Sequence, residues 1–102
     1  MKVLAFIKVI PIGTSGGSLS HYVAEVIKVL ESRGVKYQLT SFGTGDELGS
    51  LNELTGLVNE VTERLRSMGI PRVLVDVSLD LRFDKEITLE HKVRAVYEKL
   101  GK

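Results

Sequence analysis

Hydroxyl side chains are dense at residues 11–22, PIGTSGGSLSHY, immediately before an expected helix. The glycines there would let a ligand approach the backbone closely, and free N–H groups at the start of a helix can bind an anion or a ligand oxygen. A simpler interpretation is a flexible polar connection in which Ser18 caps the helix. Because such a cap needs fewer hydroxyls than this stretch supplies, with Thr14 and Ser20 to spare, a ligand site is the alternative hypothesis.

The glycines of this stretch do not form either common nucleotide-binding motif. A Walker-type loop needs a Lys and a Ser or Thr directly after its last glycine, because the ammonium holds a phosphate and the hydroxyl holds magnesium. A dinucleotide fingerprint needs the spacing G-x-G-x-x-G, whereas the glycines here are Gly13, Gly16 and Gly17. Nucleotide binding through either motif is therefore disfavoured.

Metal binding and catalysis have little support in the sequence. His21 and His91 fall on different expected helices without a histidine or cysteine partner at helical spacing, so the fold would have to assemble any zinc site. The chain has no cysteine, which excludes disulfides, thiolate metal sites and a cysteine nucleophile. We expect no metal, no cofactor and no catalytic residue.

Composition and charge restrict the class of protein and its partners. The chain has 102 residues, 43% hydrophobic and 26% charged, ordinary values for one globular domain spanning residues 1–102. Its 14 Lys and Arg against 13 Asp and Glu give a formal net charge of +1, so no nucleic-acid partner is expected. The opening MKVLAFIKVI has only a short apolar run, contains Lys8 and lacks a signal-peptide cleavage pattern. We expect a cytoplasmic protein with no membrane partner.

Apolar periodicity predicts the elements that would position these residues. The spacing of Tyr22, Val26 and Leu30 is that of one helix face, and Val73 to Asp80 alternates as a half-buried strand does. The order strand, helix, strand, strand, helix, strand, helix predicts an α+β fold, a ferredoxin-like sandwich (βαββαβ) with an additional C-terminal helix. The predicted strands are residues 2–10, 35–40, a return strand within 41–49, and 73–80; the predicted helices are 19–33, 51–68 and one capped by Thr88 that runs to Leu100.

The alternation of the strands predicts an apolar second face on the sheet. Odd positions of the first strand would face the helices, which leaves Leu4, Phe6, Ile10 and Leu74 facing away. A contiguous apolar patch in water usually marks a partner, so we expect a homo-oligomer, a homodimer or homotetramer, that covers this face. Polar residues on the same face would either pair across strands or line a pocket for a polar ligand; they are Lys8, Gln38, Thr40, Asp76 and Ser78.

Charged residues cluster where the last predicted strand ends, in LDLRFDKE at residues 79–86. Asp80, Arg82 and Asp84 lie close together there. An arginine between two carboxylates is most often an ion-pair cluster that stabilises a turn.

Three separated stretches together resemble one family, the small thiamine-binding proteins. PIGTSGGSLSHYV resembles the family's Pro-x-Gly-Thr loop followed by Ser-x-Ser and Tyr-Val, YQLTSFGT its Tyr-x-Leu-Thr-x-x-Gly-Thr, and LDLRFDK its Asp-x-Arg-x-Asp. The stretches follow one another in order over nearly the whole chain.

The resemblance implies a ferredoxin-like subunit that assembles into dimers and tetramers and binds thiamine or its hydroxymethylpyrimidine moiety without catalysis. An aminopyrimidine suits hydroxyls, a carboxylate and a stacking ring such as Phe42, and the thiazolium cation would favour Asp46 or Glu47. A diphosphate would want more cations than Arg82 and Lys8, so unphosphorylated forms are expected. The ligand-binding residues that the resemblance implies are Thr14, Ser18, Ser20, Tyr37, Thr40, Gly43, Thr44, Asp80 and Arg82.

Two other functions stay open at this point. One is an oligomeric interaction or assembly module without a small ligand, whose covered sheet face is only an interface. The other is an enzyme acting on a phosphorylated metabolite through Arg82 and the dipole of the first helix, with Asp80, Asp84 or His21 as its acid or base.

Overall fold

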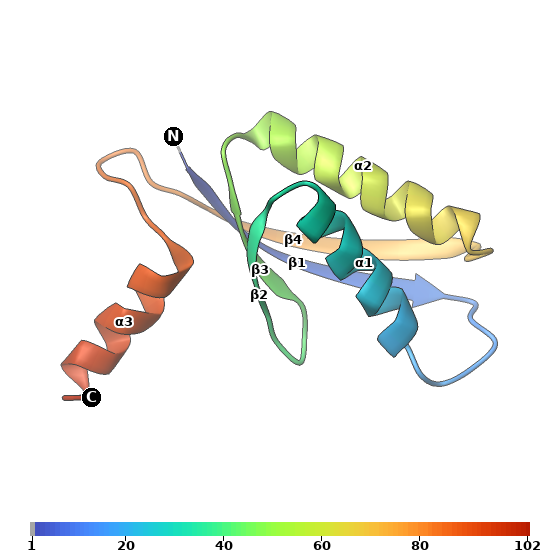
Figure 1. Ribbon diagram of the computed structural model, residues 1–102, viewed down its shortest axis with the longest axis horizontal. Coiled ribbons are helices and arrows are strands. Elements are labelled where there is room, and N and C mark those ends of the chain that lie inside the picture. Colours follow the sequence, from blue (N-terminus) through green and yellow to red (C-terminus); the bar gives the residue numbers. More distant parts are fainter. Residues whose placement is uncertain (1) are drawn as a thin grey trace.

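The computed structural model describes residues 2–102, in which four strands and three helices follow one another in the predicted order (Figure 1). Local signals explain these elements: the Ser50 hydroxyl caps the second helix by accepting from the Glu53 N–H at 3.1 Å, and the predicted cap Thr88 accepts from the His91 N–H at 3.0 Å. The strands are β1 (Val3–Ile12), β2 (Lys36–Leu39), β3 (Thr44–Leu48) and β4 (Arg72–Leu81), and the helices are α1 (Ser20–Ser32), α2 (Leu51–Ser67) and α3 (Leu89–Lys99).

The strands form one antiparallel sheet in the order β2-β3-β1-β4, the ferredoxin-like arrangement that the sequence predicts. Strand β1 is longer than predicted, since it continues through Pro11 to Ile12. Because β3 pairs with β1 only as far as Ile7, the end of β1 has one unpaired edge. A missing proline N–H is tolerated at such an edge.

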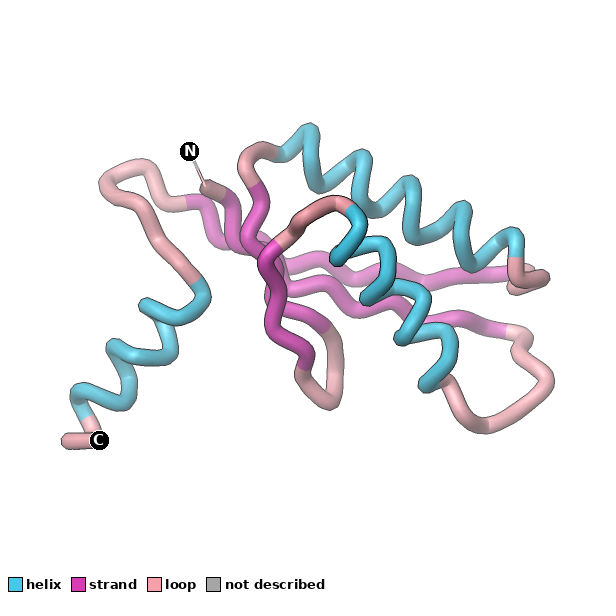
Figure 2. The backbone as a smooth tube through the Cα atoms, viewed as in Figure 1, coloured by secondary structure: helices cyan, strands magenta, loops and turns pink. Residues whose placement is uncertain are grey.

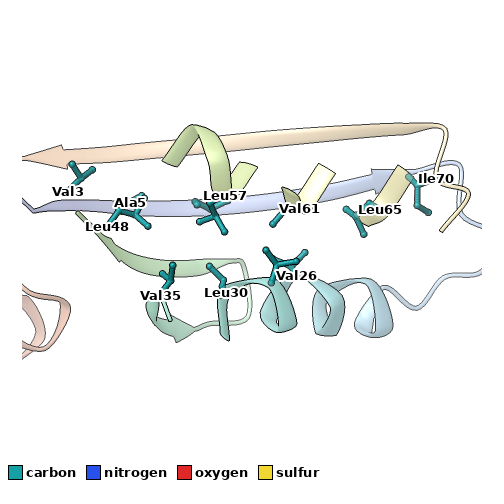
Figure 3. Packing of buried hydrophobic residues seen from close by; sticks show 12 residues of the cluster. Val3, Ala5, Val26, Leu30, Val35, Leu48, Leu57, Val61, Leu65 and Ile70 are labelled. Carbon is teal, nitrogen blue, oxygen red and sulfur yellow. The ribbon is translucent and has the colours of Figure 1, made fainter. Parts of the chain in front are cut away.

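The hydrophobic core lies between the sheet and the two helices α1 and α2. The odd positions Val3, Ala5 and Ile7 of β1 face the helices, as predicted, and all are buried. Figure 3 shows the side chains of Val26 and Leu57 and their helical neighbours turned toward these strands. The core cluster of buried residues is Val3, Ala5, Ile7, Val26, Val29, Leu30, Val35, Leu48, Leu57, Val61, Leu65 and Ile70.

Helix α3 projects from one end of the molecule, apart from α1 and α2 (Figures 1 and 2). It has no buried residue, so the apolar side that the sequence predicts for it, including Val93, Val96 and Leu100, stays exposed. Its first turn is held at the second face of the sheet, where the Leu89 N–H donates to Glu47 Oε1 at 2.7 Å.

The second face of the sheet is only partly as predicted. Phe6 and Leu74 are 37% and 41% exposed, but Leu4 is 4% exposed. The start of α3 explains the difference, because Leu89 lines a pocket with Leu4 and lies against Gly45 on this face. Of the helices in residues 2–102, none combines the length and the apolar character that crossing a membrane requires.

Candidate functional site

The hydroxyls of the loop between β1 and α1 form hydrogen bonds with one another and with the loop backbone. The Thr14 hydroxyl donates to the Gly16 carbonyl at 3.0 Å, and the hydroxyls of Ser18 and Ser20 are hydrogen-bonded to each other at 3.2 Å. The prediction that Ser18 caps the helix is wrong: Leu19 occupies the N-cap position, and no side chain there accepts a hydrogen bond. The physical reason is that the Ser18 oxygen already interacts with Ser20.

The turn between β2 and β3 is built by Thr40 and Gly43. The Thr40 hydroxyl accepts from the N–H groups of Phe42 and Gly43 at 3.1 and 3.2 Å, and lies 2.9 Å from the Gly43 carbonyl, to which it donates. A Cβ added at Gly43 would lie 2.6 Å from the Ile7 carbonyl oxygen, so glycine is required for the close approach of this turn to β1.

A cleft of about 460 Å³ opens between this turn and helix α1. Its volume is within the range of small-molecule sites, and its walls are mostly apolar with a few hydroxyls, which is the usual composition of such sites. Among the described residues that line the cleft, Lys8 is the only one with a charged side chain. The lining residues are Ile7, Lys8, Val9, Ile10, Leu19, Val23, Val26, Leu39, Thr40, Ser41, Phe42, Gly43 and Thr44.

A buried carboxylate, that of Asp46, lies behind the inner wall of this cleft. Asp46 is 0% exposed and shares a small cavity of about 10 Å³ with apolar side chains of the sheet, α1 and α2. Its Oδ2 accepts a hydrogen bond from Thr44 Oγ1 at 3.1 Å, but its Oδ1 has no partner in residues 2–102. Burial raises the pKa of Asp46 to about 7, and the Thr44 hydrogen bond opposes that shift.

The third predicted stretch lies elsewhere. Asp80 forms an ion pair with Lys92 and lines a separate pocket of about 330 Å³ on the second face of the sheet. Arg82 donates two hydrogen bonds to Asp84, at 2.6 and 3.0 Å, in an exposed loop. That bidentate pair lowers the pKa of the Asp84 carboxyl. The predicted ion-pair cluster is therefore present only in part, because Arg82 pairs with Asp84 while Asp80 pairs with Lys92.

Four of the five polar residues predicted for the second face line one or both of these pockets, whereas Asp76 lines neither. Gln38, Ser78 and Asp80 line the second-face pocket, and Lys8 lines the cleft. Thr40 lies on the wall of both. Gln38 and Ser78 line a pocket, as one interpretation expects, whereas no hydrogen bond or ion pair within residues 2–102 joins two of these five side chains across strands. The ion pair on this face joins Asp80 to Lys92 of α3 instead.

The structure thus brings only part of the expected site together. Thr40, Gly43 and Thr44 line the cleft, and Leu19, between Ser18 and Ser20, places the hydroxyl loop at its edge. The Tyr37 hydroxyl donates a hydrogen bond to Glu31 Oε2 at 2.9 Å, and the ring of Tyr37 packs against the core. Asp80 and Arg82 do not line the cleft: Asp80 lines the second-face pocket, and Arg82 lies in the loop after β4.

Sequence reasoning missed two features. Thr44 and Asp46 pair with the helix-facing positions of β1, so they lie on the covered face of the sheet. The alternation of residues along β3 could therefore have predicted polar side chains inside the core. GTSGG, residues 13–17, also has the spacing G-x-S-x-G of a nucleophile elbow. Ser15 is exposed, helix α1 begins only at Ser20, and no non-glycine residue within 2–102 has the positive φ of a strained turn, so the elbow geometry is not formed.

Comparisons with known proteins bear on the family. Residues 5–97 match the family model described as thiamine-binding protein. The chain is 40% identical over 101 residues to the UPF0045 protein YqgV of Bacillus subtilis, with 95% of this chain and 96% of that one covered. It is 36% identical over 98 residues to a UPF0045 protein of Methanothermobacter thermautotrophicus, covering 96% and 99%.

Solved structures confirm the ferredoxin-like fold. Hypothetical protein MJ1052 of Methanocaldococcus jannaschii superposes with a TM-score of 0.82 at 35% identity, covering 95% of this chain and 97% of that chain. TM0486 of Thermotoga maritima, for which a role in thiamine biosynthesis or salvage is hypothesised, superposes with a TM-score of 0.79 at 28% identity, covering 94% and 99%. By the extent of these matches, and as its three sequence stretches imply, the chain belongs to the thiamine-binding protein family.

Proposed function

We propose that the protein is a non-catalytic binder of thiamine or of its hydroxymethylpyrimidine moiety, and that the ligand occupies the cleft between α1 and the β2–β3 turn. The observation that carries the proposal is this cleft of about 460 Å³, whose walls include Thr40 and Thr44 of the family-like stretch YQLTSFGT. Apolar walls with a few fixed hydroxyls suit an aromatic heterocycle that carries polar ring atoms.

The chemistry of the cleft favours an unphosphorylated ligand with its pyrimidine inside. The hydroxyl of Ser41 can donate to a ring nitrogen, and Phe42, 74% exposed at the cleft, offers a ring for stacking. Lys8 alone would be too little charge for a diphosphate, and it would oppose a thiazolium cation placed deep in the cleft. The thiazolium of thiamine therefore belongs toward solvent.

Thermal-shift measurements with thiamine, hydroxymethylpyrimidine and their phosphates test the proposal. A ligand at 100 times its Kd stabilises the folded state by about 2.7 kcal/mol, which raises the Tm of a domain of this size by roughly 10 to 20 °C. Val23→Trp, which fills the cleft from α1, should abolish the shift, whereas Lys28→Trp on the exposed part of α1 should keep it. Tighter binding of thiamine diphosphate than of thiamine would contradict the choice of ligand.

We also propose that the protein is a homo-oligomer, a dimer or a tetramer. Three exposed features support it: the second-face residues Phe6 and Leu74, the apolar side of α3 with Val96 and Leu100 at 58% and 61% exposure, and the outer edge of β4. Analytical ultracentrifugation should show an oligomer that Phe6→Asp dissociates. A species of 11.3 kDa only, at micromolar concentration, would contradict it.

An interaction module without a small ligand is the competing function. It predicts an oligomer whose Tm none of these compounds changes. The proposal of an enzyme ranks below both, because Arg82 is paired with Asp84 and lies away from the cleft.

A further inference from the structure

One oxygen of the Asp46 carboxyl group, Oδ1, lacks a hydrogen-bond partner in residues 2–102 in either protonation state. If it is ionised, Oδ1 is a buried acceptor without a donor; if it is protonated there, the new O–H is a buried donor without an acceptor. The Thr44 hydroxyl serves Oδ2 only. An unpaired buried polar group is unfavourable, so an aliphatic side chain would be the more stable choice at this position. The carboxyl group is therefore better explained by something that it binds.

The cavity at Asp46 adjoins the cleft. Ile7, Val9, Val26 and Thr44 line both spaces, so these side chains form the partition between them. The cavity of about 10 Å³ is near the lower limit for one water molecule, and it cannot take a heterocycle unless the partition moves. Because Thr44 must keep its hydrogen bond to Asp46, the side chain that would move to join the two spaces is Val26, which would leave Asp46 at the inner end of one site.

We infer that Asp46 is the residue that recognises the ligand, by pairing with a ring nitrogen and an adjacent exocyclic amine at the inner end of the cleft. The inference rests on the proposed function and adds the chemical class of the recognised group, an amidine-like edge such as that of a 4-aminopyrimidine. One Asp46 oxygen accepts from the amine while the other shares a proton with the ring nitrogen. Both oxygens are then satisfied, and Thr44 still donates to Oδ2.

This pairing needs one proton between the carboxyl group and the ring nitrogen. At low pH the free protein already carries it on Asp46, because burial raises that pKa to about 7. At higher pH the complex must take the proton from solution, so affinity decreases about tenfold for each pH unit above that value. Affinity is also lost at a pH low enough to protonate the free pyrimidine.

No other described group facing Asp46 would produce this dependence. The residues of β1, β4, α1 and α2 that line its cavity are all Ile, Leu or Val. Its own strand contributes Thr44, which does not titrate in this range. Its partner in β2 is Tyr37, whose hydroxyl is bound to Glu31.

Calorimetry with 4-amino-5-hydroxymethyl-2-methylpyrimidine and with thiamine, from pH 5.5 to 9, tests the inference on the full chain. Wild type should take up a proton on binding and lose affinity above about pH 7. Asp46→Asn keeps an acceptor and a donor of the same shape, so it should bind with little pH dependence. Asp46→Leu should bind roughly 10- to 100-fold more weakly, the effect of losing hydrogen bonds to an ionisable group.

Asp76→Asn, at an exposed position of β4 that lines neither the cleft nor the second-face pocket, is the matched control and should behave as wild type. The same pyrimidine without its amino group should bind weakly to wild type and discriminate little between wild type and Asp46→Leu. The contrary outcome is that Asp46→Asn and Asp46→Leu bind the compounds with the same affinity and pH profile as wild type. In that case Asp46 holds only an ordered water, and the inference fails while the proposed function stands. If wild type binds neither compound at any pH, the proposed function fails and the inference fails with it.

Discussion

Asp46 and Glu47 are consecutive carboxylates on β3, both buried, yet they face opposite sides of the sheet. Glu47 Oε1 accepts from the Leu89 N–H at 2.7 Å and its Oε2 lies 3.4 Å from Lys2 Nζ, so both oxygens have partners. Asp46 has one hydrogen bond and an oxygen without a partner. A buried carboxylate with complete partners fastens two elements together, whereas one left incomplete indicates a ligand.

The largest expected effect concerns the pH dependence of stability at Asp46. Its pKa rises from 3.8 in an ordinary setting to about 7 in the folded protein, so the folded state binds this proton more tightly than the unfolded chain does. The stability that the group contributes is full below about pH 4 and is lost as pH rises through 7, on the order of 4 kcal/mol in total. Urea unfolding from pH 4 to 8 should show this loss in wild type and not in Asp46→Asn.

A second variant in the same urea series shows whether the pH dependence of stability comes from the burial of Asp46 or from a general effect of acid. Asp80→Asn should follow the wild-type profile between pH 5 and 8, because Asp80 is exposed at the second face and paired with Lys92. Parallel profiles for wild type and Asp46→Asn would mean that Asp46 is solvated, and the contrast with Glu47 would disappear.

Gly43→Ala tests whether the cleft depends on the close approach of the turn to β1. The added Cβ would lie 2.6 Å from the Ile7 carbonyl oxygen, so the turn must move, at a cost of roughly 1–3 kcal/mol in the free energy of unfolding and with weaker ligand binding. Gly16→Ala is the control, because a Cβ there has no neighbour within 4 Å. Equal urea midpoints for the two variants would show that the turn has room to relax.

Glu47→Ala should release α3 without affecting the cleft. Removing the carboxylate leaves the Leu89 N–H without its acceptor, at a cost of about 1–3 kcal/mol, and Glu47→Gln should restore much of the contact because its amide oxygen can accept. Hydrogen exchange should accelerate in residues 89–99 of Glu47→Ala, with ligand affinity unchanged. Unaltered exchange would mean that Lys36–Glu90 and Lys92–Asp80 suffice to hold the helix.

The smallest effect is expected at the hydroxyl loop, outside both carboxylate environments. Ser18→Ala should change the free energy of unfolding by no more than about 0.5 kcal/mol, because it loses only an exposed contact with Ser20. Ser50→Ala should cost about 1 kcal/mol, since Ser50 caps α2. Urea unfolding compares the two, and an equal loss would restore a capping role to Ser18.

The fold was predictable where the pattern is local. Helix α2 repeats Leu57, Val61 and Leu65 at helical spacing, and the alternation of β1 correctly assigned Val3 and Ala5 to the helix-covered face. The predicted cap at Ser18 was wrong because the sequence does not show whether the Ser18 hydroxyl bonds to the helix N–H groups or, as in the structure, to the Ser20 hydroxyl. The burial of Leu4 was not predicted because the residues that cover it, such as Leu89 at the start of α3, lie far along the chain.

The candidate site was predictable only in its second stretch, where Thr40, Gly43 and Thr44 are close in sequence and line one cleft. Asp80 and Arg82 belong to a family-like motif, but they lie at the end of β4 and just after it, in a different part of the molecule from the cleft. The distance between them and the cleft depends on strand pairing over long separations, which composition and spacing do not encode.

By itself, the sequence determined the order of the elements, the face to which each strand residue points and the hydroxyls available for binding, because these follow from short periods and local backbone preferences. Only the tertiary structure decided which polar groups are enclosed. Asp46 and Glu47 are neighbours with the same charge, and they differ because α1 and α2 surround one with aliphatic side chains while α3 supplies the other with an N–H donor. Partners of that kind come from elements distant in the chain, so burial and hydrogen bonding separate two carboxylates that the sequence places side by side.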